Sequence, residues 1–190
     1  RMYSLRFPGE DLTGLSMAKL RGREGARMKK IYAHEAERVG IMWNRRAYDP
    51  NDYDSSDPIN QALTSASSAL YGIAHAVIAG LGFVPALGVV HNGTDRAFVY
   101  DIADLYKAEV AIPAAFDAVA SGAMKPGVAV RRLVRDAVVD KRLMPRMVTD
   151  LKYVMHVTDD DTFSDAELYL WSELEVIAAG VNWSEHESAP

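Results

Sequence analysis

The sequence contains no cysteine, and this absence excludes disulfide bonds, thiolate metal sites and thiol nucleophiles. It also lacks an apolar run of the roughly 18 residues that a membrane helix needs, because glycines, His75 and Pro85 interrupt residues 73–90. Serine hydrolase chemistry has no support, since no Gly-x-Ser-x-Gly occurs. No basic and apolar leader begins the chain, and we therefore expect a cytoplasmic location and no membrane partner.

The composition that remains is that of a folded protein. The chain has 190 residues, of which 49% are hydrophobic and 25% are charged, and these values exclude a mostly disordered chain. This length accommodates one well-packed domain or two small ones. The net charge of -5 disfavours a protein that binds nucleic acid through bulk positive charge, but it is compatible with a local basic face.

Hydrophobic spacing predicts an all-α fold that consists of several helices and is preceded by one strand. The strand is predicted over residues 3–7, where apolar and polar side chains alternate. Helical spacing then occurs over residues 13–39, 58–81, 113–120, 128–139, 144–155 and 164–178. Asp57 and Pro58 form a strong helix start, and Gly40 forms a helix end. The side of the long helix 58–81 opposite its apolar stripe is small and polar, with Asn60, Thr64, Ser67, Ser68 and Tyr71.

One histidine and three acids form a candidate metal site. His91 lies in a glycine turn, and Asp101 and Asp104 follow about ten residues later, where a helix would place both on one face. Glu24 lies between Gly22 and Gly25, which predict a break or a close backbone approach inside the first long helix. Such ligands suit Mg²⁺ or Mn²⁺. Spacing alone nevertheless favours a surface histidine with solvated acids.

Two groups of arginines are candidates for DNA contact. Arg21 and Arg27 flank Glu24 along the first long helix, and Arg45 and Arg46 stand next to the aromatic Tyr48. Basic side chains beside aromatic rings are typical of sites that bind phosphates and stack bases. The alternative for each group is a charged, solvated helix face.

Six sequence blocks, in this order, resemble one known family: LRGREG (20–25), GIMWNRRAYDP (40–50), DPINQA (57–62), LYG (70–72), PALGVVHNG (85–93) and FVYDIAD (98–104). The chain is similar, over residues 1–155, to the CRISPR adaptation integrases, the first of the two core spacer-acquisition proteins. The likeness is to the Cascade-linked type I-E branch of that family. Several blocks in one order are more specific than any single motif.

This resemblance implies a role for the candidate residues. Glu24, His91 and Asp104 match the family's ligands for a divalent metal, Mg²⁺ or Mn²⁺, and Asp101 matches an acid that supports them. The matching blocks also include residues of the catalytic and DNA-contact region: Arg21, Arg27, Tyr48 and Tyr71. For the two tyrosines, an aromatic ring packed in the core with its hydroxyl bonded is the alternative.

The resemblance also implies a domain organisation. Members of the family have an N-terminal β domain and a C-terminal all-α catalytic domain. We therefore expect residues 1–9 to be the last strand of the β domain, residues 10–157 to be the helical catalytic domain, and residues 158–190 to be a linker, a C-terminal helix and a tail.

The activity implied by the resemblance is spacer integration. The 3′-hydroxyl of a protospacer DNA attacks a phosphodiester at the leader–repeat junction of the CRISPR array. The expected partners are double-stranded and branched DNA, a second copy of the chain, and the small second adaptation protein. Two alternatives are a metal-dependent nuclease of branched or single-stranded DNA without integration, and a helical scaffold that binds a protein partner without catalysis.

Overall fold

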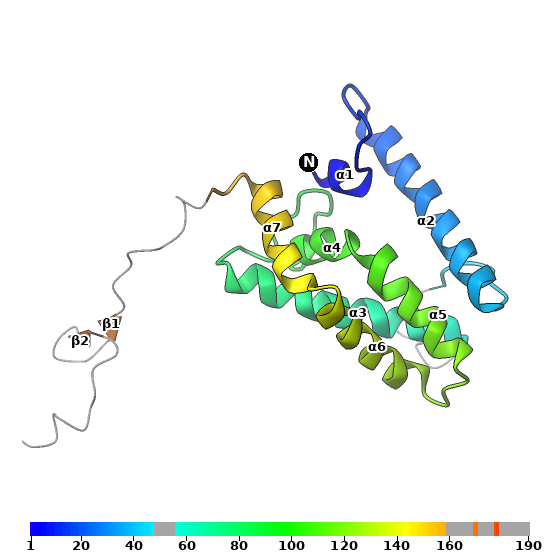
Figure 1. Cartoon of the computed structure of the whole chain (residues 1–190). Helices are drawn as coiled ribbons and strands as arrows, with labels where there is room; N and C mark the ends of the chain where they lie inside the picture. The colour runs from blue at the N-terminus through cyan, green and yellow to red at the C-terminus, as the bar shows by residue number, and fades with distance from the viewer. Residues whose placement is uncertain (48–55, 159–168, 171–176, 179–190) are drawn as a thin grey trace, which may run out of the picture. The chain divides into compact units, whose positions relative to one another are not determined.

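The computed structural model describes residues 1–47, 56–158, 169–170 and 177–178. The chain divides into two compact units, Arg1–His156 and Val157–Pro190. The first unit contains, in chain order, α1 (Met2–Arg6), α2 (Met17–Val39), α3 (Pro58–Gly80), α4 (Ala97–Asp104), the π-helix η1 (Lys107–Ala111), α5 (Ile112–Ala120), α6 (Pro126–Asp140) and α7 (Leu143–Met155) (Figure 1). The described residues of this unit form helices and no strand, which confirms the predicted all-α class.

The strand predicted over residues 3–7 is wrong, because most of this segment belongs to the short helix α1. Five alternating residues are too few to distinguish the period of a strand from that of a helix. In the helix, Tyr3 and Arg6 are buried, and Tyr3 packs in a small cluster with Phe7 and with Leu20 of α2. The packing of Tyr3 and Phe7 against Leu20 of α2 therefore favours a helix over a strand in this segment.

The caps of the two longest helices follow the prediction. Gly40 ends α2 in the left-handed conformation, with a φ of 69°, which costs a glycine little. The carboxylate of Asp57 accepts a hydrogen bond from the backbone N–H of Asn60 at 2.8 Å and so caps the start of α3. The predicted break or close backbone approach near Glu24 is wrong, since α2 continues through Gly22 and Gly25, with open space beside both.

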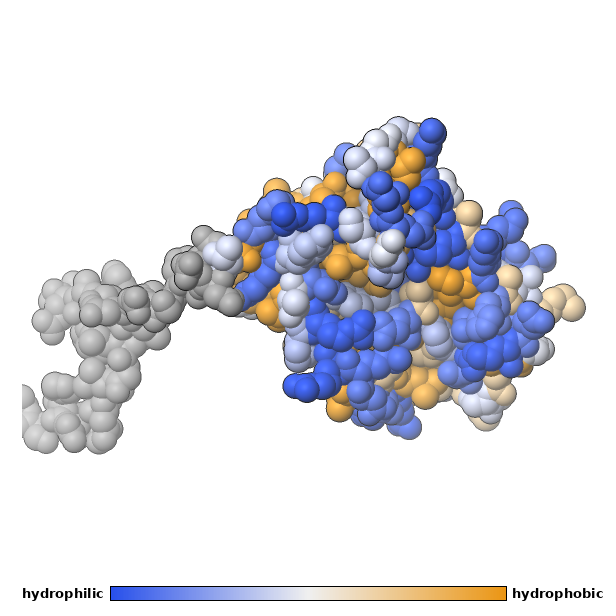
Figure 2. Space-filling model, turned by 45° about the horizontal axis from the view of Figure 1, so that its top comes forward, coloured by the Kyte–Doolittle hydropathy of each residue, from blue (hydrophilic) through white to orange (hydrophobic). Residues whose placement is uncertain are grey.

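The central element of the first unit is α3, which packs against α4, η1, α5, α6 and α7. Its side chains Ala62, Ala66, Leu70 and Ala74 are completely buried. Among the described helices, α3 is long and apolar enough to cross a membrane by length and composition alone. Its buried positions form the core of this unit, so helix packing accounts for its apolar composition. Hydrophilic side chains cover much of the face shown in Figure 2.

A tight loop precedes α4 and a π-helix follows it. A side chain at Gly88 would collide with the carbonyl oxygen of His91 and with Ala97, so only glycine lets this loop fold back on the start of α4. After Asp104, the last residue of α4, the chain enters η1 at Lys107. Short π-helical turns frequently occur at functional sites.

The second unit contains a short antiparallel pair, β1 (Tyr169–Leu170) and β2 (Ile177–Ala178), in which Tyr169 lies opposite Ala178. The helix predicted over residues 164–178 is therefore wrong at these four positions. Aromatic and β-branched residues such as Tyr169 and Ile177 favour strands, and this preference outweighs the helical spacing here. The remaining residues of the predicted helix lie outside the described residues.

Candidate metal and DNA site

Asp101 of α4 is a completely buried carboxylate that fixes the loop before it. Its Oδ2 accepts hydrogen bonds from the backbone N–H groups of Val89 at 2.6 Å and Val90 at 2.9 Å. Its Oδ1 accepts one from the backbone N–H of His91 at 3.0 Å and lies 2.7 Å from His91 Nδ1. A carboxylate with three backbone donors acts as an acceptor, so His91 Nδ1 carries the proton. Asp101 thereby sets both the orientation and the tautomer of the imidazole.

Asp104, one turn further along α4, faces the other ring nitrogen of His91. The distance from His91 Nε2 to Asp104 Oδ2 is 3.9 Å. Asp104 Oδ1 lies 2.6 Å from the ammonium of Lys107, which also donates a hydrogen bond to the Tyr71 hydroxyl at 2.6 Å. Burial lowers the pKa of Lys107, but Asp104 and Tyr71 outweigh that effect and raise it above its ordinary value. Lys107 is therefore a permanent cation beside Asp104.

Glu24 joins these residues from α2. A cavity of about 440 Å³ lies between α1, α2 and the loop before α4, and we call it the Glu24 cavity. Its lining residues are Tyr3, Arg6, Arg21, Glu24, Val90, His91, Asn92 and Asp104. The Glu24 carboxylate accepts two hydrogen bonds from Arg27, from Nε to Oε2 and from Nη2 to Oε1, both at 2.9 Å. These bonds raise the pKa of Arg27, so its charge persists at any ordinary pH.

The three expected metal ligands thus line one cavity, but each acid is paired with a cation. Among the described residues, no three His, Asp or Glu side chains lie close enough together to hold one ion. Glu24 is paired with Arg27, and Asp104 is paired with Lys107. The donor types still suit a divalent cation, because a carboxylate-oriented imidazole and two further carboxylates line the same cavity.

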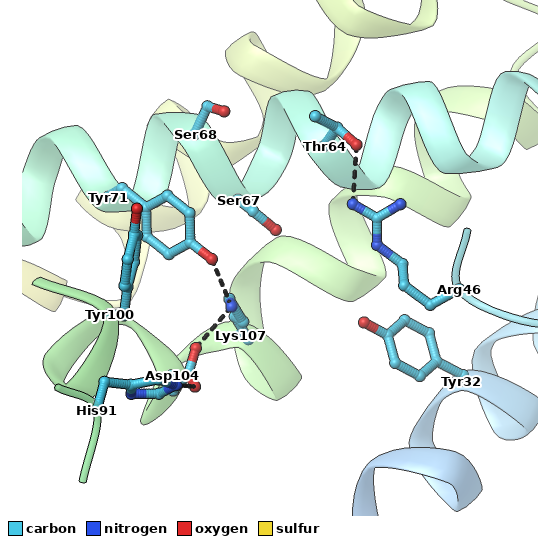
Figure 3. Close-up of a pocket in the computed structure, with 10 residues that line it drawn as sticks. All are labelled: Tyr32, Arg46, Thr64, Ser67, Ser68, Tyr71, His91, Tyr100, Asp104 and Lys107. Carbon is cyan, nitrogen blue, oxygen red and sulfur yellow. Dashed lines mark hydrogen bonds and ion pairs between the residues drawn. The ribbon is translucent and has the colours of Figure 1, made fainter. Parts of the chain in front are cut away.

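A second, hydroxyl-rich pocket of about 470 Å³ shares His91 and Asp104 with the Glu24 cavity, and we call it the hydroxyl pocket (Figure 3). Its other lining residues are Tyr32, Arg46, Thr64, Ser67, Ser68, Tyr71, Tyr100 and Lys107. The Tyr71 and Tyr100 rings meet edge to face, with centroids 4.9 Å apart. Burial raises the pKa of Tyr32, while Arg46 and Lys107 partly oppose this effect. The pocket therefore presents hydroxyl groups, two cations, an imidazole and the Asp104 carboxylate to one space.

The predicted DNA-contact residues occupy different places. Arg21 is exposed and lines the Glu24 cavity, and Tyr71 lines the hydroxyl pocket. Arg46 also lines the hydroxyl pocket, where it donates hydrogen bonds to Asn60 Oδ1 and Thr64 Oγ1, both at 2.8 Å. The remaining three lie elsewhere: Arg27 is paired with Glu24, Arg45 is exposed beside an apolar pocket, and Tyr48 lies outside the described residues.

Sequence reasoning did not single out Lys107 or Arg6. Lys107 stands three residues after Asp104, a spacing that brings two side chains together on a helical segment, so the sequence contained that signal. No such signal exists for Arg6, because its burial beside Glu24 depends on how α1 packs on α2.

Comparisons with known proteins identify the family of this chain. The family model "CRISPR associated protein Cas1" matches residues 10–148. The chain is 41% identical to CRISPR-associated endonuclease Cas1 of Clostridium sp. (strain SY8519), over 97% of the chain and 62% of the relative. It is 45% identical to Cas1 2 of Thermus thermophilus, over 80% of the chain and 46% of the relative. The identity to Escherichia coli Cas1 is 37%, over 82% of the chain and 51% of the relative.

Solved structures extend the likeness to three dimensions. A crystal structure of a TtCas1–DNA complex has a TM-score of 0.77 and 44% sequence identity, covering 83% of this chain and 59% of that one. A crystal structure of TtCas1 has a TM-score of 0.71 at the same identity, covering 79% of this chain and 56% of that one. The chain thus spans about half to three-fifths of the length of these relatives. It belongs to the CRISPR-associated Cas1 family.

Proposed function

We propose that this chain is the helical catalytic part of a CRISPR adaptation integrase of the type I-E-like branch. In this proposal the 3′-hydroxyl of a protospacer DNA attacks the phosphodiester at the leader–repeat junction in a metal-dependent transesterification, which forms a new phosphodiester, breaks the old one and releases the strand on its other side with a free hydroxyl. The observation that carries the proposal is that Glu24, His91 and Asp104 line one cavity, with His91 oriented by Asp101. The endonuclease names of the relatives and the DNA-bound structural neighbour support it.

Glu24, His91 and Asp104 would hold Mg²⁺ or Mn²⁺. An imidazole whose other nitrogen is bound to a carboxylate is typical of a metal ligand, and Asp101 supplies that carboxylate. An imidazole ligand also favours tolerance of Mn²⁺. When bound, such an ion neutralises charge on the attacked phosphate and favours the deprotonated hydroxyl.

The other residues of the site hold and orient the DNA. Arg21 lines the Glu24 cavity and can donate two parallel hydrogen bonds to a phosphodiester. Lys107 places a second cation beside Asp104, and Tyr71 fixes its ammonium. The hydroxyl pocket next to them offers donors and acceptors to a sugar–phosphate backbone. We propose that Arg27, Arg45, Arg46 and Tyr48 extend the DNA contacts around this centre.

The distribution of charge favours a DNA partner more than the net charge does. All 21 lysines and arginines precede residue 157, together with 17 of the 26 acids. Residues 1–156 therefore carry a net charge of +4, and residues 157–190 carry a net charge of -9. A positive helical unit attracts the phosphate backbone. On the resemblance, we further propose a second copy of the chain and the small second adaptation protein as partners.

The test is a strand-transfer assay with Mn²⁺, a protospacer duplex with free 3′-hydroxyls and a leader–repeat duplex. We expect the parent chain to form branched products, and we expect His91→Ala and Asp104→Ala to abolish them while retaining the parent's circular dichroism. Isothermal titration with Mn²⁺ should show the same loss of metal binding. Unchanged product formation by either variant, or none by the parent, rejects the proposal.

Matched controls and a second readout separate the alternatives. His34→Ala and Asp95→Ala remove the same groups from exposed positions and should leave strand transfer unchanged. A nuclease without integration, which the endonuclease names of the relatives favour, would release hydrolysis products but never join donor to target. A scaffold without catalysis would bind no Mn²⁺ and change neither DNA.

A further inference from the structure

We propose, on the basis of the function proposed above, that Arg6 of α1 is a phosphate-binding residue of the Glu24 cavity that grips one phosphodiester of the DNA. Arg6 lies on the side of the cavity formed by α1 and α2, together with Arg21. This site is an addition to the ligand set of Glu24, His91 and Asp104, which lies on the same cavity.

The guanidinium of Arg6 is buried but poorly satisfied. Its side chain is only 4% exposed. Among the described residues, its Nε and Nη2 have no hydrogen-bond partner. The guanidinium carbon lies 5.3 Å from the centroid of the Tyr3 ring, but a ring face does not replace the two missing hydrogen bonds. Buried polar groups in folded proteins are nearly always hydrogen-bonded, so these two donors are unfavourable as they stand. Two unused donors on one planar fork match two oxygens of a phosphate.

Glu24 does not satisfy Arg6. The nearest contact between them is 3.9 Å, from Arg6 Nη1 to Glu24 Oε1. Both oxygens of Glu24 are hydrogen-bonded to Arg27 at 2.9 Å, so Arg27 is the arginine whose charge this carboxylate neutralises. The α1 side of the cavity therefore has an excess of positive charge.

The rest of the cavity has the opposite character. Asp104 and His91 line its far side and provide oxygen and nitrogen ligands. The wall with His91 and Asp104 thus attracts a cation, and the wall with Arg6 and Arg21 attracts an anion. A phosphodiester bound by Arg6 would extend from the arginine wall toward the expected metal ligands.

The experiment compares DNA binding with stability in the full chain. Fluorescence anisotropy measures the affinity for a branched DNA duplex in EDTA, from 50 to 300 mM salt (concentrations on the order of those used for DNA-binding proteins). We expect Arg6→Met to weaken binding on the order of tenfold and to reduce the slope of log K against log salt by about 0.9, the value for one phosphate contact. Its melting temperature should equal or exceed that of the parent, because two buried donors without hydrogen bonds are removed.

Two further variants sharpen the test. Arg6→Lys retains the charge but not the fork, and we expect it to preserve the salt slope while weakening affinity less than Arg6→Met. Arg38→Met removes an arginine of α2 that is already paired with Glu35 and Asp117, and it should leave the salt slope unchanged.

A purely structural role would produce the opposite result. In that case Arg6→Met lowers the melting temperature and leaves the salt slope as in the parent, and this outcome overturns the inference. So does a parent chain that binds no DNA in EDTA. Because no metal or catalysis is needed here, failed strand transfer rejects the proposed function without deciding the role of Arg6.

Discussion

Two apolar clusters of very different size lie behind the two sides of the Glu24 cavity. The larger one surrounds α3 and includes Phe98 and Ile102 of α4, which flank Asp101 in the sequence. The smaller one consists of Tyr3, Phe7 and Leu20, with three partly buried neighbours. Asp104 therefore belongs to the densely packed side, and Glu24, Arg6 and Arg21 to the sparsely packed side, which Val90 of the His91 loop also contacts.

The difference in size between the two clusters indicates which half of the site is rigid. Local opening in a protein begins where few apolar contacts resist it. Asp101 ties the His91 loop to α4 with three backbone hydrogen bonds, while Glu24 is held by hydrogen bonds from the side chain of Arg27. We therefore expect Glu24 to be the ligand that adjusts and His91 and Asp104 to be the ones that stay in place.

The largest effect should come from truncating the larger cluster at Phe98, which is completely buried. Phe98→Ala should destabilise the first unit by about 3–5 kcal/mol, because it removes a large apolar side chain and leaves a cavity. Chemical denaturation with far-ultraviolet circular dichroism measures this. A loss below about 1 kcal/mol would show that the larger cluster does not govern global stability.

A smaller and more local effect is expected at Gly88. Gly88→Ala should cost about 1–3 kcal/mol, because the new methyl group collides with the His91 carbonyl and forces the loop away from Asp101. Mn²⁺ affinity should fall about 10- to 100-fold as the imidazole loses its orientation. Titration calorimetry measures the affinity.

The control for Gly88 is Gly72→Ala on α3. Gly72 has open space where its side chain would extend, so this variant should retain Mn²⁺ affinity and be slightly more stable. Equal losses of Mn²⁺ affinity in both variants would contradict a specific role for the Gly88 loop.

Phe7 tests the smaller cluster. Phe7→Ala should lower the free energy of opening α1 by about 1–2 kcal/mol, less than a large core truncation, because the sparse surroundings can collapse. Hydrogen exchange followed by mass spectrometry should show faster exchange in α1 and the first turns of α2, with α3 and α4 unchanged. Acceleration spread evenly over both clusters would mean that the two sides of the cavity open together.

The sequence predicted the helices best where local chemistry decides the structure. Asp57 and Gly40 carry the side-chain oxygen and the conformational freedom that caps require, and the structure uses both. The segment at residues 3–7 was mispredicted, because its helical state depends on burial against Leu20, far along the chain. Gly22 and Gly25 also led to a wrong prediction. Their low helix propensity is a weak local effect, and α2 continues through both of them.

In the candidate site, too, some features could be predicted from the sequence and others depend on how the helices pack. The resemblance placed Glu24, His91 and Asp104 together, and the structure brings all three to one cavity. Arg27 and Lys107 each stand three residues after the acid that they pair with, so the helical spacing contained that signal, but it did not decide whether each acid pairs with this cation or with a metal. Arg6 was unpredictable, since only the packing of α1 on α2 buries it.

The smallest expected effect concerns an ion pair rather than either cluster. Hydrogen bonds from Arg146 lower the pKa of Glu109, with Lys141 adding to the effect. A lowered pKa in the folded state means that the stabilisation is complete above the ordinary glutamate pKa of 4.5 and disappears as the pH falls through the lowered value. Because both partners are more than a third exposed, solvent screening limits the contribution to roughly 0.5 kcal/mol.

Glu109→Gln should therefore be less stable than the parent at pH 7, and the difference should vanish near pH 3 (roughly a unit and a half below the ordinary glutamate pKa). Urea denaturation at several pH values measures this, with the exposed Glu37→Gln as the control. A difference that persists in acid would assign the effect to packing around η1. A loss comparable to that of Phe98→Ala would mean that surface charge, not the larger apolar cluster, makes the His91 side of the cavity the more stable one.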